Sequence, residues 1–285
     1  MRFSEDRLTA FTAANGVQRR VHVWAPDAPS AVILAIHGGM AHGGDYLTPA
    51  LYFRRHGIAT VAYDLCGHQD LRRVDIPAFD VFLDDSLLFL QWVKQQYPGL
   101  PVYVMGHSMG ALIATHLALS RFAGEAAVRG YILSSPYYVN AIKVSPVLMA
   151  LAGVLGALAP RMKVPLASLT DQLTHDGAIT ARHHDDERDG IRATEITVRF
   201  GNALTKAQQG LAARMPAWRQ PLFAVVAGAD QLADADAAEA MLKSVPAPLL
   251  TYRRYPQNFH ENFNELNREQ IFADILAWMA ATARQ

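Results

Sequence analysis

The sequence has little cysteine and no excess of either charge, and both absences narrow the class of protein. Its 285 residues contain one cysteine, Cys66, so no intramolecular disulfide can form. A lone cysteine fits a reducing compartment, and we predict a cytoplasmic location. Lys plus Arg and Asp plus Glu both number 26, which gives a formal net charge of zero. The chain also lacks a basic block, so we expect no nucleic-acid partner.

Long apolar segments of the targeting or spanning kind are also missing. The N-terminal stretch MRFSEDRLTAFTAANG carries charges throughout and has no apolar run of the signal-peptide type. The most apolar internal run, residues 144–160, is too short to cross a membrane and is interrupted by Pro146 and by glycines. Two interpretations of this run stay open: a helix packed on the core, or a cap helix that makes transient contact with a membrane or micelle surface.

Apolar strand-like runs alternate with helical patterns at both ends of the chain. Two short strands around Asn15-Gly16 form a predicted hairpin, over residues 8–13 and 19–24. Buried strands are predicted at 32–36, 58–64, 101–108, 130–136, 222–230 and 249–255, and helices at 79–97, 109–121, 235–243 and 268–284. This alternation is typical of an α/β fold with a mostly parallel central sheet and helices on both faces.

The alternation stops in the middle of the chain, where no βαβ rhythm is visible. We interpret this segment as a helical cap, or lid, inserted over the carboxyl ends of the strands. The predicted organisation is a core over residues 1–136 and 218–285, interrupted by a cap over 137–217. No internal repeat or linker is present, so the chain is expected to form one compact unit.

A serine lies between two glycines where a predicted strand meets a predicted helix, in the stretch Gly106-His107-Ser108-Met109-Gly110. A nucleophile on so tight a turn needs a strained backbone, and side chains two residues to either side would clash. The following helix directs its free N–H groups and the positive end of its dipole toward an anion that forms there. We therefore predict that Ser108 is a nucleophile and that Gly106 and Gly110 permit its turn.

A serine nucleophile needs a base and an acid, which follow it along the chain in this architecture. After the strand at 222–230 one histidine remains, His260, and we predict that it is the base. Asp230 ends that strand and is the predicted acid, which would orient the imidazole and stabilise its charged form. Asp234 and Asp236 compete for this role, but both are better explained as partners of the next helix N-terminus.

The oxyanion that forms on the substrate needs at least two hydrogen-bond donors. The backbone N–H of Met109, directly after the nucleophile, is one predicted donor. The second is expected from the loop HGGMAHGGDY, where Gly39 lets a backbone N–H approach the substrate. His37 and His42 in the same loop are expected to make structural hydrogen bonds.

Four motifs, HGGMAHGGDY, GHSMGA, AGADQLAD and FHENFNE, occur in this order over most of the chain. Together they resemble the α/β-hydrolase superfamily and, within it, the monoacylglycerol lipase and lysophospholipase branch of serine aminopeptidase-like hydrolases. The resemblance implies the same roles for Ser108, Asp230, His260, Gly39 and Met109. It also implies a cap over an apolar acyl tunnel and no cofactor.

The chain departs from this branch in two loops. The turn DLCGHQ after the second buried strand lacks the arginine, second glycine and serine usual there. In the oxyanion loop, Ala41 and Asp45 occupy positions where glycerol-handling lipases carry an acidic and a basic residue, so these positions do not support a glycerol head group. In the cap, RHHDDERDG is interpreted as a solvated surface and not as a metal site.

The predicted function is that of a serine carboxylic ester hydrolase, a lipase or esterase, that acts on monoacylglycerol-like or lysophospholipid-like esters through an acyl-enzyme. Two alternatives stay open. One is a peptidase or amide hydrolase with the same triad, and the other is a hydrolase-fold ligand-binding protein without catalysis. The substrate is expected to be a small acyl ester, with no metal and no cofactor, and the sequence leaves the oligomeric state undetermined.

Overall fold

A computed structural model describes residues 2–69, 73–141 and 158–283 of the chain. Its centre is an eight-stranded sheet with the order β1-β2-β4-β3-β6-β7-β10-β11. The strands are β1 (Arg7–Thr12), β2 (Gln18–Trp24), β3 (Ala31–Ile36), β4 (Ile58–Tyr63), β6 (Val102–His107), β7 (Val128–Ser134), β10 (Leu222–Ala227) and β11 (Leu250–Tyr255). The first two form the predicted antiparallel hairpin, and all later neighbours from β4 to β11 pair in parallel.

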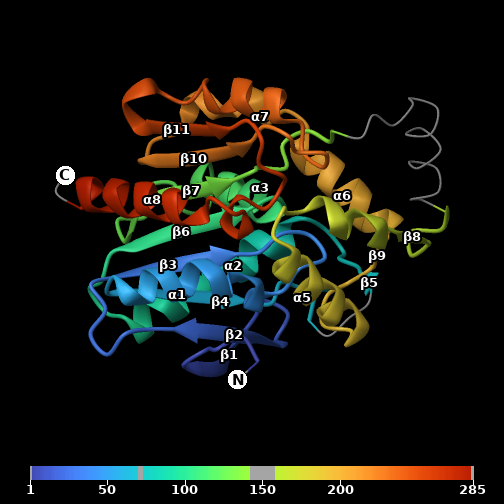
Figure 1. Ribbon diagram of the computed structural model, residues 1–285, viewed down its shortest axis with the longest axis horizontal. Helices are drawn as coiled ribbons and strands as arrows, with labels where there is room; N and C mark the ends of the chain where they lie inside the picture. The colour runs from blue at the N-terminus through green and yellow to red at the C-terminus, as the bar shows by residue number, and fades with distance from the viewer. Residues whose placement is uncertain (1, 70–72, 142–157, 284–285) are drawn as a thin grey trace.

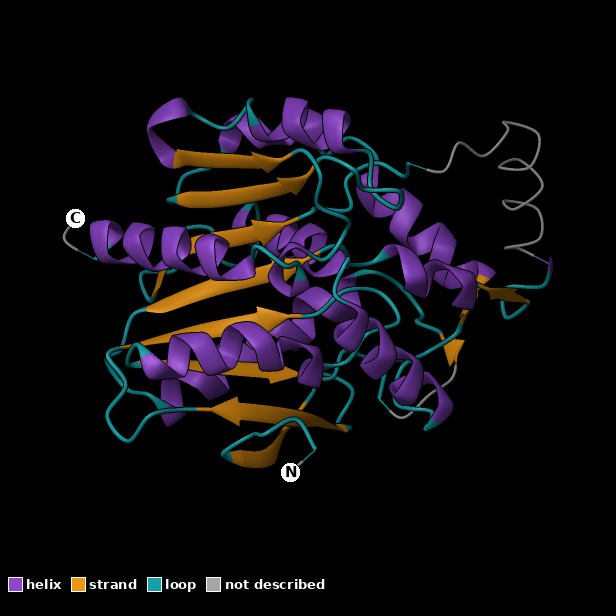
Figure 2. Ribbon diagram, viewed as in Figure 1, coloured by secondary structure: helices purple, strands orange, loops and turns teal. Residues whose placement is uncertain are grey.

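Helices cover both faces of this sheet, as predicted (Figure 2). One face packs against α1 (Leu47–Arg55) and α8 (Arg268–Thr282), with Phe53 and Phe272 in its core. The other face packs against α2 (Asp80–Gln96), α3 (Met109–Ala118) and α7 (Ala235–Leu242), with Phe89 and Leu112 in its core. The central strands β3 and β4 are fully buried because both faces are covered.

The described part of the segment between β7 and β10 lies beyond the carboxyl ends of the parallel strands, toward which their arrowheads point (Figures 1 and 2). Its elements are β8 (Lys163–Pro165), η2 (Ala167–Gln172), α5 (Gly177–Arg188), β9 (Glu195–Thr197), α6 (Val198–Gln208) and η3 (Ala212–Ala217). The remaining short helices are η1 (Gly43–Tyr46), η4 (Ala247–Leu249) and η5 (Asn262–Asn264). The cap boundaries at 137 and 217 stay a prediction.

Two features of the fold were not anticipated. The cap contains strands as well as helices, since β8 and β9 form a three-stranded sheet with β5 (Arg73–Val74) from the core sequence. Helix α1 was also missed, because it is short and its first turn holds Pro49, which reads as a break although the first turn tolerates proline.

The apolar run at 144–160 lies almost wholly outside the described residues, so both interpretations of it stay open. None of the helices in the described part of the chain combines the length and the apolar composition that crossing a bilayer requires.

Candidate active site

Ser108 lies on the turn between β6 and α3, at the carboxyl end of a central strand. Its backbone has φ 55° and ψ −118°, a left-handed conformation that a residue other than glycine adopts only under strain. The turn is tied to the neighbouring strand, because the Ser108 N–H donates to the Ser134 carbonyl over 2.9 Å. The Ser108 carbonyl in turn accepts the first bonds of α3, so strand and helix hold the strained residue from both sides.

The two glycines of this turn are required by close backbone approach. A Cβ at Gly110 would lie 1.9 Å from the carbonyl oxygen of Ile36 on β3. A Cβ at Gly106 would lie 2.5 Å from the carbonyl oxygen of Gly110. Real Cβ atoms do not approach backbone oxygens so closely, so any side chain at either position must push the turn apart.

The glycine-rich loop after β3 lies against Ser108 and Met109. A Cβ at Gly38 would lie 3.3 Å from the Ser108 Cβ, and one at Gly39 would lie 3.9 Å from the Met109 sulfur. His37 shapes this loop, since its Nε2 accepts the Leu65 N–H and its Nδ1 therefore donates to the Gly38 carbonyl over 2.8 Å. Burial lowers the pKa of His37 to about 4, so the ring is neutral and serves as a structural hydrogen-bonding group.

Asp230 and His260 are brought together from two separate loops at the carboxyl edge of the sheet. Oδ2 of Asp230 accepts from Nδ1 of His260 over 2.7 Å, and Oδ1 accepts the N–H groups of Leu232 and Ala233. Burial raises the pKa of Asp230, but the charge and hydrogen bond of His260 outweigh it, so the net shift is downward. Asp230 is therefore a buried carboxylate whose two oxygens are both occupied.

The two competing aspartates serve the next helix, as predicted. Asp234 is the N-cap of α7 and accepts the Ala237 N–H over 2.9 Å. Asp236 lies in the first turn of the same helix, where its exposed side chain pairs with Arg254. Neither carboxylate bonds to His260.

His260 is buried in the loop between β11 and η5. Burial lowers the pKa of His260, but the charge and hydrogen bond of Asp230 more than compensate, so the net shift is upward. Its ring lies 4.8 Å from the ring of His107, the residue before Ser108. In the described part of the chain the Ser108 hydroxyl makes no hydrogen bond to His260, and such bonds are often loose before substrate binds.

A family profile described as "Serine aminopeptidase, S33" matches residues 27–267. The chain belongs to this family. The α/β-hydrolase fold and the monoacylglycerol lipase-like branch predicted from the motifs are both confirmed. Relatives named monoacylglycerol lipase, monoglyceride lipase and phospholipase show that this S33 hydrolase is an ester-hydrolysing enzyme of the lipase and esterase kind.

Relatives of this S33 hydrolase cover nearly its whole length. It is 29% identical to a monoacylglycerol lipase of Mycolicibacterium smegmatis, over 95% of this chain and 96% of the relative. It is 27% identical to the human monoglyceride lipase, over 94% and 88% of the two chains. The solved structure of a soluble variant of the Saccharomyces cerevisiae monoglyceride lipase, in complex with a substrate analogue, superposes with a TM-score of 0.83 at 18% identity, over 97% of this chain and 94% of that one.

Several polar side chains that hold the His260 loop of the S33 hydrolase were missed by the sequence analysis. Asn262, which is fully buried, donates from Nδ2 to the Ser135 hydroxyl over 2.9 Å. Asn258 donates to Oδ1 of Asn262, and Glu265 accepts the Phe259 N–H over 2.7 Å. The motif NFHENFNE pointed to this loop, but nothing in the spacing of its amides and carboxylates indicated their partners.

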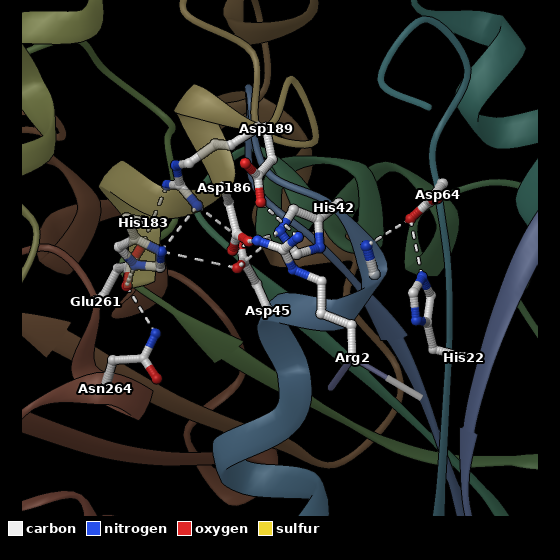
Figure 3. A network of polar contacts seen from close by, with 12 residues as sticks. Arg2, His22, His42, Asp45, Asp64, His183, Asp186, Asp189, Glu261 and Asn264 are labelled. Carbon is white, nitrogen blue, oxygen red and sulfur yellow. Dashed lines mark hydrogen bonds and ion pairs between the residues drawn. The ribbon is translucent and has the colours of Figure 1, made fainter. Parts of the chain in front are cut away.

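A buried network of charged side chains lies beside this loop and joins the cap to the core (Figure 3). His183 and Asp186 of α5 face inward, where His183 contacts Glu261 and Asp186 contacts His42. Arg2, near the N-terminus, donates to Asp186 over 2.7 Å. The interpretation of RHHDDERDG as a solvated surface was wrong for His183 and Asp186, because tertiary contacts bury both: His183 bonds to Glu261, and Asp186 pairs with Arg2.

One part of this network has the composition of a metal site. Donor atoms of His42, Asp45 and Asp186 lie within 4.8 Å of one another, the one such group found in the described residues. Arg192 already pairs with Asp45, and Arg2 pairs with Asp186. Metal-binding histidines almost always donate their second N–H to a partner, whereas Nδ1 of His42 has none among the described atoms. The donor set therefore suits ion pairing better than metal binding.

A small cavity of about 30 Å³ lies between this network and the Ser108 turn. Gly38 and His107 line it on the side of Ser108, and Asp45, Glu261 and Phe263 also line it. Its size suits a water molecule and not an acyl chain. The acyl tunnel implied by the resemblance therefore stays a prediction.

Proposed function

We propose that this enzyme cleaves carboxylic esters with Ser108, His260 and Asp230 as its catalytic triad. The observation that carries the proposal is the buried 2.7 Å hydrogen bond between His260 and Asp230, next to a serine held in a strained turn. Nδ1 of His260 donates to the aspartate, which leaves Nε2 as the ring atom able to accept a proton. The raised pKa of His260 suits a group that takes and returns protons near neutral pH.

The proposed reaction follows from these positions. Ser108 attacks the ester carbonyl while His260 takes its proton, and Asp230 stabilises the imidazolium that forms. The N–H groups of Met109 and Gly39 hold the oxyanion, since their loops lie against the serine. His260 then protonates the leaving alcohol and activates the water that releases the acid, so the mechanism uses no metal or cofactor.

The proposed substrates are monoacylglycerol-like or lysophospholipid-like acyl esters. The relatives named monoacylglycerol lipase and a Bacillus subtilis relative named phospholipase YtpA, 29% identical over 87% of this chain, support this class. The head group stays open, because Asp45 is engaged with Arg192 and Ala41 offers no polar group.

A peptidase or amide hydrolase with the same triad is the alternative. An aminopeptidase with this triad needs a free carboxylate to bind the substrate's amino terminus. The two carboxylates that line the cavity, on Asp45 and Glu261, are already paired with Arg192, and Glu261 is also paired with His183. This pairing favours esters over peptides.

Two further aspects of the protein remain proposals. Transient contact with a membrane or micelle is supported by Leu158 and Met162, which are exposed apolar residues of the cap. A cytoplasmic location is supported by the single cysteine, Cys66, which is buried and free.

The test compares p-nitrophenyl acyl esters with an aminoacyl-nitroanilide for the wild type and Ser108→Ala. We expect ester turnover by the wild type and a loss of about 10⁶-fold in kcat for the variant, with an unchanged circular dichroism spectrum. Labelling of Ser108 by a fluorophosphonate probe provides a second measurement. Full activity in the variant would refute the triad, faster amide cleavage would establish the peptidase, and absent labelling of folded wild type would favour the ligand-binding protein.

A further inference from the structure

One stretch of the cap contacts both loops that the proposed mechanism uses. We call residues 173–193 the strap. At its start, the Leu173 carbonyl accepts the N–H of Glu261, the residue after His260, over 2.8 Å. At its end, the Ala193 N–H donates to the carbonyl of Met40, the residue after Gly39, over 2.9 Å. The strap therefore bridges the base loop and the oxyanion loop through main-chain hydrogen bonds.

Arg192 lies between one carboxylate from each of these two loops, Asp45 and Glu261. Its Nη1 donates to Oδ2 of Asp45 over 2.6 Å, and its Nη2 lies 3.5 Å from Oε1 of Glu261. The exposed fraction of the three side chains is 5% for Arg192, 11% for Asp45 and 8% for Glu261. Buried carboxylates paired with one planar guanidinium are held at a fixed separation, because the fork of donors is rigid.

His183 fixes the remaining oxygen of Glu261. Nη1 of Arg192 lies 3.4 Å from Nδ1 of His183, and a guanidinium only donates, so Nδ1 is an acceptor. Nε2 of His183 therefore carries the proton and donates to Oε2 of Glu261 over 2.9 Å. Asn264 donates to the same oxygen over 2.7 Å, so the side chain next to the base has no freedom to turn.

We propose that Arg192 is a positioning residue, which holds Asp45 and Glu261 together and so sets the separation between the oxyanion loop and His260. The strap is then a permanent part of the active site and not a lid that opens for substrate. This inference rests on the proposed triad.

Removal of one member of a buried ion pair leaves its partners unpaired, which destabilises the fold. The test therefore uses Arg192→Lys, which keeps the charge but loses the fork, together with the triple variant Asp45→Asn, Arg192→Met and Glu261→Gln, which removes all three charges. Each is assayed for kcat and KM with p-nitrophenyl butyrate and for its melting temperature. Because misplacement of a catalytic group by about 1 Å costs about 10²-fold, we expect kcat to fall by roughly that factor in the triple variant and about tenfold in Arg192→Lys. KM should change by less than about threefold, since a misplaced base or oxyanion donor weakens the transition state and not ground-state binding.

Arg199→Met provides the matched control. Arg199 also joins cap to core, by donating to Asp75 over 3.1 Å, but neither residue contacts the strap or the two loops. We expect its kcat to stay within about twofold of the wild type, as for other partly exposed ion pairs.

The pH profile supplies a readout that loss of packing does not produce. The charged and titratable groups facing His260 are Asp230 from the turn after β10, Glu261, Arg192 from the strap and His107 from β6. Burial lowers the pKa of His107 to about 3, so it stays neutral. The limb is measured in the single variants Glu261→Gln and Arg192→Met below their melting temperatures, because its position does not scale with the folded fraction. Glu261→Gln removes a negative charge and should move the acidic limb of kcat/KM to lower pH, whereas Arg192→Met should move it to higher pH.

The possible results distinguish failure of this inference from failure of the proposed function. Wild-type kcat in Arg192→Lys and in the triple variant would overturn the positioning role. A fall in kcat that only follows the folded fraction, with an unmoved acidic limb, would overturn it as well. Absence of ester turnover by the wild type would instead refute the proposed function, and the wild-type assay alone detects that outcome.

Discussion

The turn that carries Ser108 and the loop that carries His260 lie side by side but are built in opposite ways. Contacts between backbones place the serine, since Gly106 and Gly110 let β6, α3 and β3 approach one another. Side chains from distant parts of the chain place the histidine: Asp230 bonds to it directly, Ser135 holds its loop through Asn262, and His183 of the cap does so through Glu261. The first arrangement is local and visible as a motif, whereas the second is distributed and depends on many partners. The two should therefore respond differently to mutation.

Asp230→Asn changes the side-chain contact that matters most for the position of His260. We expect kcat to fall by about 10⁴-fold with little change in the melting temperature, because an amide favours the wrong tautomer of His260 without altering the shape of the site. Measurements of kcat and thermal unfolding check this. Asp234→Asn is the control: asparagine caps a helix N-terminus about as well as aspartate, so its kcat and melting temperature should stay close to those of the wild type. Equal losses of kcat in both variants would contradict the assignment of Asp230.

Gly110→Ala tests the backbone contacts that place Ser108. The added Cβ would lie 1.9 Å from the Ile36 carbonyl oxygen, so β3 and α3 must separate. We expect the unfolding free energy in denaturant to fall by about 3 kcal/mol, with loss of fluorophosphonate labelling at Ser108. Gly177→Ala, where a Cβ meets nothing within 4 Å, is the control and should change stability by less than about 1 kcal/mol. An unaffected Gly110→Ala protein would show that the turn is not sterically confined.

Asn262→Ala measures how much one of the distributed contacts contributes. The substitution leaves the buried Ser135 hydroxyl without its amide donor. We expect a loss of about 1–3 kcal/mol in unfolding free energy and about tenfold in kcat, because the His260 loop gains freedom. Gln270→Ala, which removes an exposed bond to Asp274, should change stability by less than about 0.5 kcal/mol. Wild-type kcat in Asn262→Ala would mean that the remaining contacts hold the loop by themselves.

The smallest expected effect is on the pH dependence of kcat/KM, which tests how Asp230 holds His260. The base acts only when deprotonated, so the rate falls as the pH drops through the pKa of His260. Burial lowers that pKa, but Asp230 raises it by more, so the acidic limb is expected above the ordinary histidine value of about 6.5. In Asp230→Asn the limb should move to lower pH. A wild-type limb below the ordinary value would argue that desolvation outweighs the Asp230 charge.

Much of this protein could be predicted before its structure was considered. Seven of the eight predicted strands lie within about two residues of their observed bounds, and the 222–230 run ends as a strand at Ala227, with Asp230 on the turn beyond it. Ser108 and Gly110 were found because a strained turn needs glycine at fixed spacing. The contact between Asp230 and His260 could be predicted because both follow strands that end at one edge of the sheet, and their roles as acid and base stay a proposal.

The interpretation of the cap failed where burial depended on partners elsewhere. RHHDDERDG has the composition of a solvated helix, yet His183 and Asp186 are buried. Only the folded chain brings them against Glu261 and Arg2, which come from opposite ends of the sequence.

The sequence by itself therefore determined the fold and the strained turn at Ser108, because steric limits and hydrophobic periodicity act over a few residues. The tertiary structure alone decided which charges would pair across the cap. A charged side chain has no preferred partner within its own segment, and its burial is favourable only where the fold delivers an opposite charge. That is why Arg192 carries no signal in the sequence and yet, in the structure, lies between the two loops on which the proposed chemistry depends.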